Sequence, residues 1–74
     1  MIEYEIYSVK DVVTGNFSDI QIMVNRDCAI RWFKGLCAES KIKNDLQLFY
    51  LGTYNLSTGE ISSAVDFVVG GSDE

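Results

Sequence analysis

The chain has 74 residues, of which 47% are hydrophobic, and carries a formal net charge of −5. This length fits a single domain that buries roughly 60% of the surface its unfolded chain exposes, and the apolar content excludes a disordered protein. No apolar run approaches the ~20 residues of a membrane span, and the acidic N-terminus Met-Ile-Glu-Tyr-Glu does not look like a secretory signal, so we expect a cytoplasmic protein with no membrane partner.

The first two elements are predicted to be strands. Residues 2–9 and residues 17–24 alternate between two sets of side chains, as the strands of a sheet do. Thr14-Gly15-Asn16 between them has the composition of a turn, because Gly and Asn tolerate positive φ. The two strands are therefore expected to form an antiparallel hairpin.

A helix is predicted from Arg26 to about Glu39. Asn25 before it is a good N-cap, since its side chain can accept a hydrogen bond from a free amide of the first turn. Apolar residues recur at spacings of three and four and form one stripe: Ala29, Ile30, Trp32, Phe33, Leu36 and Cys37. Arg31 and Lys34 are expected to face away from this stripe.

The second half repeats the strand pattern. Residues 46–54 and 60–69 are predicted strands, joined by a polar turn that contains Gly59. The element order is ββαββ, which predicts an α+β fold with a four-stranded antiparallel sheet and one helix packed on one face. Residues 1–69 are expected to form this domain, and residues 70–74 a flexible acidic tail.

One helix of this length covers only one face of such a sheet. The residues expected on the uncovered face are Tyr7, Val9, Phe49, Leu51 and Val68. Exposed apolar surfaces of this kind mark interaction sites, and we expect dimerisation through this one. Stacking of single-stranded DNA bases on its aromatic rings, or burial by strand curvature, are the open alternatives.

No residue pattern predicts catalysis. The chain has no histidine, its carboxylates do not cluster, and its turn glycines lack the spacing of a phosphate-binding loop. Cys28 and Cys37 would point to opposite faces of the helix, so neither a disulfide nor a metal site is expected. Cys37 is expected to pack inward and Cys28 to be less buried. We predict a protein that is not an enzyme and binds no cofactor or metal.

Charge is unevenly distributed along the chain. Five cations lie between residues 26 and 43: Arg26, Arg31, Lys34, Lys41 and Lys43. With two acids in the same segment its charge is +3, and the rest of the chain therefore carries −8. Such a distribution can steer a partner, although ordinary solubilising charge explains it equally well.

Several motifs resemble the small nonstructural proteins of gokushovirus-type microviruses, which are single-stranded DNA phages. In chain order the matching residues are Tyr7-Ser8-Val9-Lys10-Asp11, Gly15, Phe17, Ala29, Arg31, Phe33, Asp45, Leu48, Phe49, Leu51-Gly52-Thr53 and Thr58-Gly59-Glu60-Ile61. The resemblance implies an accessory role in viral DNA replication or single-strand synthesis, in a family sometimes described as DNA-binding. It brings no catalytic residues.

Two other functions remain open from the residues. An acidic phage protein could inhibit a host nucleic-acid-binding protein, as anti-CRISPR proteins do, by placing carboxylates where phosphates would bind. A homodimeric structural protein is the third possibility. The candidate interaction residues are Tyr7, Phe49, Leu51, Arg31, Lys34, Glu3 and Glu5. Convergence of the cations beside Phe49 or Tyr7 would favour DNA, and one acidic face would favour the inhibitor.

Overall fold

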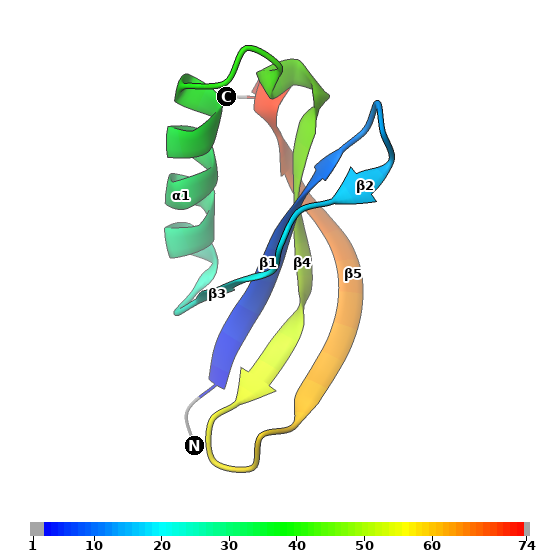
Figure 1. Cartoon of the computed structure of the whole chain (residues 1–74). Coiled ribbons are helices and arrows are strands. Elements are labelled where there is room, and N and C mark those ends of the chain that lie inside the picture. Colours follow the sequence, from blue (N-terminus) through cyan, green and yellow to red (C-terminus); the bar gives the residue numbers. More distant parts are fainter. Residues whose placement is uncertain (1–2, 74) are drawn as a thin grey trace.

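The computed structural model describes residues 3–73 and shows an α+β fold, as predicted (Figure 1). A single antiparallel sheet has the strand order β2-β1-β4-β5, and β3 pairs with β1 beside β2. The elements are β1 (Glu3–Asp11), β2 (Asn16–Phe17), β3 (Gln21–Met23), α1 (Arg26–Ala38), the 3-10 turn η1 (Lys43–Asp45), β4 (Leu46–Asn55), β5 (Ile61–Gly70) and the 3-10 turn η2 (Gly71–Asp73).

The sheet has five strands where four were predicted, because the expected strand 17–24 is divided in two. Phe17 pairs with Lys10 and Ile22 pairs with Ile6, on opposite sides of an irregular segment at residues 18–20. Within that segment Ser18 is bound to Val9 of β1 twice: its amide donates to the Val9 carbonyl at 2.8 Å, and its Oγ accepts a hydrogen bond from the Val9 amide at 3.1 Å. β2 and β3 therefore form one edge of the sheet, which is interrupted at residues 18–20.

Helix α1 begins as predicted. Asn25 Oδ1 accepts a hydrogen bond from the Cys28 amide at 2.9 Å, which satisfies one free donor of the first turn. Ala29, Phe33 and Cys37 are buried, whereas Cys28 is exposed, as expected. Most of the predicted stripe therefore packs on the sheet, with Ile30 and Trp32 partly buried against the core, whereas Leu36 is 40% exposed.

In β1, the set of side chains that faces the helix is the opposite of the expected one. Tyr7 and Val9 are 0% and 5% exposed and pack in the core with Phe33 and Leu48. Their placement on the uncovered face was therefore wrong. Val68 is also partly buried against this core. Alternation shows that Tyr7 and Val9 share a face, but the path of the chain into α1 decides which face the helix covers.

The helix lies beside only one end of the elongated sheet (Figure 1). Beyond the helix, β4 bulges at Leu51, which has no partner in either neighbouring strand. Gly52 follows with φ +130°, and a Cβ there would lie 1.9 Å from the Ser62 carbonyl oxygen. Only glycine fits this close approach of β4 and β5.

The chain after residue 69 remains in contact with the domain through η1, β4 and α1. Gly70 is the last residue of β5, and Gly71 in η2 is buried. Of the expected tail, only residue 74 lies outside the described residues, as do residues 1 and 2 of the first predicted strand. None of the helices within residues 3–73 has both the length and the apolar character needed to cross a membrane.

Candidate functional site

Three phenylalanine rings meet on the face of the sheet that points away from α1, which we call the open face. Phe49 on β4 lies between Phe17 on β2 and Phe67 on β5, with ring centroids 5.3 Å and 5.9 Å apart. Both pairs have edge-to-face geometry, with interplanar angles of 75° and 79°. Phe17 and Phe67 are 43% and 52% exposed, so the rings remain accessible to a ligand.

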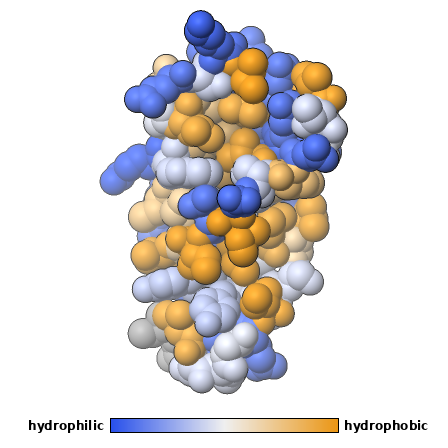
Figure 2. Space-filling model, viewed as in Figure 1, coloured by the Kyte–Doolittle hydropathy of each residue, from blue (hydrophilic) through white to orange (hydrophobic). Residues whose placement is uncertain are grey.

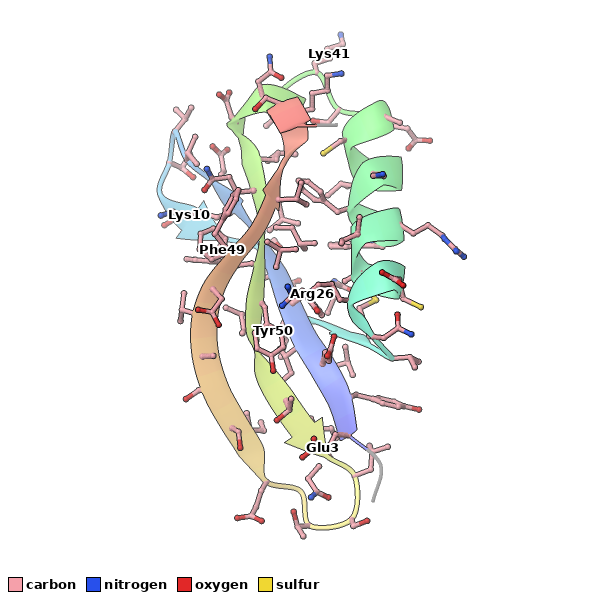
Figure 3. The ribbon with its side chains drawn as sticks, turned by 180° about the vertical axis from the view of Figure 1, so that it is seen from behind. Glu3, Lys10, Arg26, Lys41, Phe49 and Tyr50 are labelled. Atoms are coloured by element: carbon pink, nitrogen blue, oxygen red, sulfur yellow. The ribbon has the colours of Figure 1, made fainter. Side chains whose placement is uncertain are left out.

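A lysine side chain completes this group. Lys10 Nζ lies 5.7 Å from the Phe17 ring centroid and 5.9 Å from that of Phe49, within the range of a cation–π interaction (Figure 3). The register explains the arrangement, because Lys10 pairs with Phe17 and Phe49 pairs with Phe67 across the strands. We call Lys10, Phe17, Phe49 and Phe67 the Phe–Lys cluster.

The strand pairing also separates the charges of the sheet. Cross-strand partners point to the same face, so the pairs assign each paired residue to the open face or to the helix side. Four carboxylates have a cross-strand partner, and the pairing places all four on the helix side of the sheet: Glu3, Glu5, Asp11 and Asp66. Lys10 is the charged residue that the described ladders place on the open face. The open face is therefore apolar and cationic within an acidic protein.

Apolar residues extend this face beyond the cluster. Ile22 and Ile61 are 49% and 63% exposed and belong to the same side by their pairing with Ile6 and Tyr54. Figure 2 shows hydrophobic residues gathered over the middle of the molecule. Such a continuous exposed apolar surface is typical of an interaction site.

A polar network occupies the helix side of the sheet. The Tyr7 hydroxyl donates a hydrogen bond of 2.7 Å to Glu5 Oε1, and the Arg26 guanidinium carbon lies 5.7 Å from the Tyr50 ring centroid. Burial, with the hydrogen bond to Glu5, raises the pKa of Tyr7 to about 12. Interaction with the Tyr7 hydroxyl raises the pKa of Arg26. Arg26 is thus held among aromatic rings on this side.

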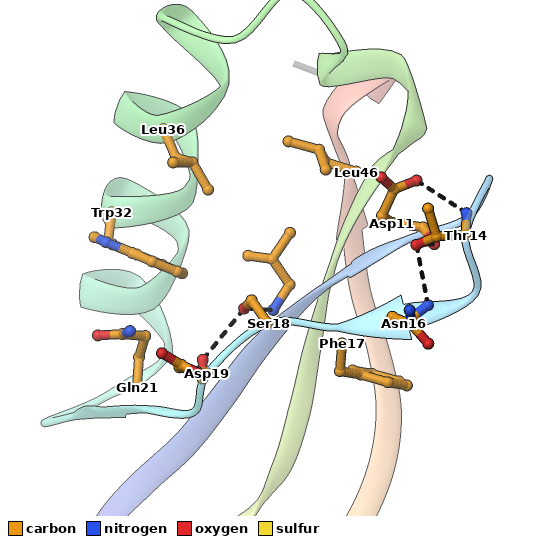
Figure 4. A pocket seen from close by; sticks show the side chains of 11 residues that line it. Asp11, Thr14, Asn16, Phe17, Ser18, Asp19, Gln21, Trp32, Leu36 and Leu46 are labelled. Carbon is orange, nitrogen blue, oxygen red and sulfur yellow. Dashed lines mark hydrogen bonds between the residues drawn. The ribbon is translucent and has the colours of Figure 1, made fainter.

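A groove lies between α1 and the β1–β2 hairpin (Figure 4). Its volume is about 490 Å³, and Trp32 and Leu36 of α1 face Val9, Phe17 and Leu46 of the sheet across it. Asp11 at one end uses its Oδ1 to accept hydrogen bonds from the amides of its own turn, at Val13 (2.9 Å) and Thr14 (3.4 Å). The groove offers an apolar depression and no catalytic arrangement.

The predicted interaction residues are distributed over different surfaces. Phe49 lies on the open face as expected, but Tyr7 is buried beneath α1 and was wrongly placed there. Leu51 is half-buried in the β4 bulge. Arg31 and Lys34 are exposed on α1, on the opposite side of the core from the Phe–Lys cluster.

Convergence of the central cations was expected to favour DNA binding, and a single acidic face was expected to favour the inhibitor. The structure shows each arrangement only in part. Of the five central cations, Arg26 reaches Tyr7, and Lys41 lies at the far end of the molecule (Figure 3). Glu3, Glu5 and Asp66 do share the helix side, but Arg26 lies among them near Glu5. The acidic surface is therefore interrupted by a cation.

Sequence reasoning missed three members of the Phe–Lys cluster. Lys10, Phe17 and Phe67 were not among the candidate interaction residues, because the sequence does not show which strands are neighbours in the sheet. The available signal was the hairpin: a turn centred on residues 12–15 brings Lys10 opposite Phe17. No comparable short-range signal joins Phe49 to Phe67. Residues 3–73 contain no group of three or more side chains suited to holding a metal ion.

Comparison with known proteins places this fold and site in a family. No curated protein and no solved structure matches the chain. The model of the family described as Phage ORF5 protein matches residues 4–73, which span every strand and the helix. The matched range also includes all four residues of the Phe–Lys cluster. The chain therefore belongs to the Phage ORF5 protein family.

Proposed function

We propose that this phage protein binds single-stranded DNA through the Phe–Lys cluster and serves as a non-enzymatic accessory in viral DNA replication or single-strand synthesis. The observation that carries the proposal is the grouping of Phe17, Phe49 and Phe67 around Lys10 on a sheet face without paired carboxylates. The motif resemblance to microvirus nonstructural proteins is consistent with this role and favours a microvirus as the source.

Single-strand binders hold their ligand in two ways that this face provides. Bases stack on exposed aromatic rings, each contributing about 1–3 kcal/mol, and stacking tolerates any base sequence. A sheet surface with two or three such rings is a recurring platform for single strands. Lys10 lies beside two of the rings, where its ammonium can contact the phosphate that follows a stacked base.

The net charge of −5 does not oppose this function, because the four carboxylates that have a partner in the strand ladders do not lie on the open face. The paired carboxylates are on the helix side, so the sheet itself stands between them and the ligand. With a single lysine at the site, binding should depend mainly on stacking. We expect the logarithm of the binding constant to fall with log salt at a slope of only about −0.7, the value for one phosphate contact.

The test is fluorescence anisotropy of a labelled single-stranded oligonucleotide, titrated with the full chain at several salt concentrations. Phe67→Ala should weaken binding by roughly 5- to 150-fold, which corresponds to one lost stacking contact of about 1–3 kcal/mol. Lys10→Gln should remove most of the salt dependence. Its matched control is Lys34→Gln, the same charge change on the outer surface of α1.

Two outcomes would overturn the proposal. One is the absence of saturable binding at low salt. The other is an equal loss of affinity in Lys10→Gln and Lys34→Gln, which would show a general effect of charge with no contribution from the cluster. Circular dichroism of each variant confirms that a loss of binding does not reflect unfolding.

A second candidate is the acidic inhibitor, and one observation favours it: Glu3, Glu5 and Asp66 share one side of the sheet. In this role the protein would occupy the DNA-binding groove of a host defence nuclease. An RNA-guided nuclease in a DNA-cleavage assay serves as the probe. If the protein is this inhibitor, the wild-type chain should inhibit DNA cleavage by the nuclease, and Asp66→Asn should weaken the inhibition. The wild-type chain should also fail to bind the oligonucleotide.

A further inference from the structure

The outer edge of β5 is unpaired within residues 3–73. β5 is the last strand of the order β2-β1-β4-β5, and Figure 1 shows it along the outside of the sheet. It spans ten residues, from Ile61 to Gly70, which corresponds to an edge about 33 Å long. From Ile61 to Val69, backbone amides and carbonyls on the side away from β4 therefore face solvent as a row of donors and acceptors.

The sequence of this edge carries few of the features by which monomeric proteins protect exposed strands, although two register shifts interrupt its pairing with β4. Its sequence, ISSAVDFVVG, contains no lysine, arginine or proline, and Asp66 is its one charged residue. Three apolar side chains along it, Ile61, Val65 and Phe67, are 63%, 67% and 52% exposed. A long, exposed and apolar edge strand is a template for pairing with another strand.

We propose that two copies of the chain pair antiparallel through β5, about a two-fold axis perpendicular to the sheet. A second copy is the partner that this edge fits, because a two-fold axis matches each strand with one of equal length and composition. The strand is nearly free of charge, so self-pairing creates no like-charge contacts in most registers. Asp66 excludes the one register in which it would face its own copy.

A dimer of this kind needs only a small part of the molecular surface. Weakly associating proteins bury about 600 Å² on each partner, which is about an eighth of the 4863 Å² that the described chain exposes. Six of the ten residues of β5 are exposed. The other four are Ala64, Val68, Val69 and Gly70. We therefore expect dimerisation at micromolar concentrations.

The geometry of this pairing has a consequence for the open face. A two-fold axis perpendicular to the sheet keeps the same face of both copies on the same side. Since Phe67 belongs to β5, the two Phe–Lys clusters would flank the axis on one continuous surface. This consequence rests on the proposed function, whereas the dimer itself does not. Pairing of two open faces against each other would instead bury both clusters.

The test is the mass of the full chain by analytical ultracentrifugation over a range of micromolar concentrations, for three proteins. Wild type should show a monomer–dimer equilibrium. Val65→Lys should weaken it by roughly tenfold or more, because a lysine at an edge blocks pairing. Val65 is exposed and has no partner in β4, so the variant should fold. Val13→Lys is the control, since Val13 is 74% exposed in the distant hairpin turn.

A wild-type chain that stays monomeric would overturn the inference. So would a dimer that Val65→Lys and Val13→Lys affect equally. A dimer disrupted by Phe49→Ala but not by Val65→Lys would show that the open faces pair instead. Hydrogen exchange gives an independent readout: β5 amides should be protected in wild type and lose protection in Val65→Lys, while those of β4 remain unchanged.

The DNA titration separates this inference from the proposed function. Val65→Lys should still bind a short oligonucleotide, and it should lose affinity mainly for one long enough to reach both clusters. If neither protein binds DNA but the wild type dimerises through β5, the proposed function fails and the dimer stands. If the wild type binds DNA as a monomer, the reverse holds.

Discussion

Replacing Tyr7 by phenylalanine should change stability in a way that depends on alkaline pH. Burial and the 2.7 Å hydrogen bond to Glu5 raise the pKa of Tyr7 from its usual 10.0 to about 12. The unfolded chain therefore releases the phenolic proton before the folded one. The contribution of this group is fully present below pH 10 and is lost as the pH rises through about 12.

The magnitude follows from the size of the shift. Two pKa units correspond to at most about 2.7 kcal/mol, and solvent around the part-buried hydrogen bond to Glu5 lowers this value. At pH 8 wild type should exceed Tyr7→Phe in free energy of unfolding by about 1–3 kcal/mol, the contribution of a buried hydrogen bond to a charged group. This difference should decrease by up to about 2.7 kcal/mol between pH 10 and 12.

Urea unfolding followed by circular dichroism at several pH values measures the difference. Tyr54→Phe controls for the loss of one tyrosine hydroxyl on the other face of the sheet. Glu5→Gln should reduce the pH dependence of wild type, because it removes the carboxylate that contributes to the raised pKa of Tyr7. A difference between wild type and Tyr7→Phe that stays constant from pH 8 to 12 would refute the reasoning.

Three further predictions concern the frame that holds the site, and urea unfolding at neutral pH measures all of them. Gly52→Ala should lower the free energy of unfolding by at least about 2 kcal/mol, because the new Cβ meets the Ser62 carbonyl. Gly35→Ala in α1 should raise it by about 0.5–1 kcal/mol, because its Cβ meets nothing within 4 Å. Phe33→Ala should cost about 3–5 kcal/mol, because the ring is 0% exposed in the core; a smaller loss would mean that the helix packs loosely. Asn25→Ala should cost about 1 kcal/mol by removing the cap on the Cys28 amide, and Asn25→Gly much less.

Local signals in the sequence predicted the elements well. The cap at Asn25 and the spacing of Ala29, Phe33 and Cys37 identify α1 and its buried stripe, since both depend on residues within a few positions of each other. Alternation in β4 likewise separates Leu46 and Leu48, which are buried, from Phe49 on the open face. Such short-range patterns reflect the periods of helix and strand alone.

Pairing between strands that are distant in the sequence decided which face of β1 is buried and where β4 bulges. The side of the sheet that α1 covers depends on how the chain leaves β3, so alternation alone could not show that Tyr7 is buried. The bulge at Leu51 arises where β4 meets two neighbours at once, and a strand read by itself contains no sign of it.

The candidate site illustrates the same division. The sequence by itself determined that Phe17, Phe49 and Phe67 occupy strands and that the chain is acidic as a whole, whereas Lys10 falls just past the strand predicted at residues 2–9. Only the tertiary structure brought these four residues together and placed the paired carboxylates on the other side of the sheet. The physical reason is that residues 10 and 67 become neighbours of Phe49 through registers set by the whole sheet, and a shift of one residue would send each side chain to the opposite face.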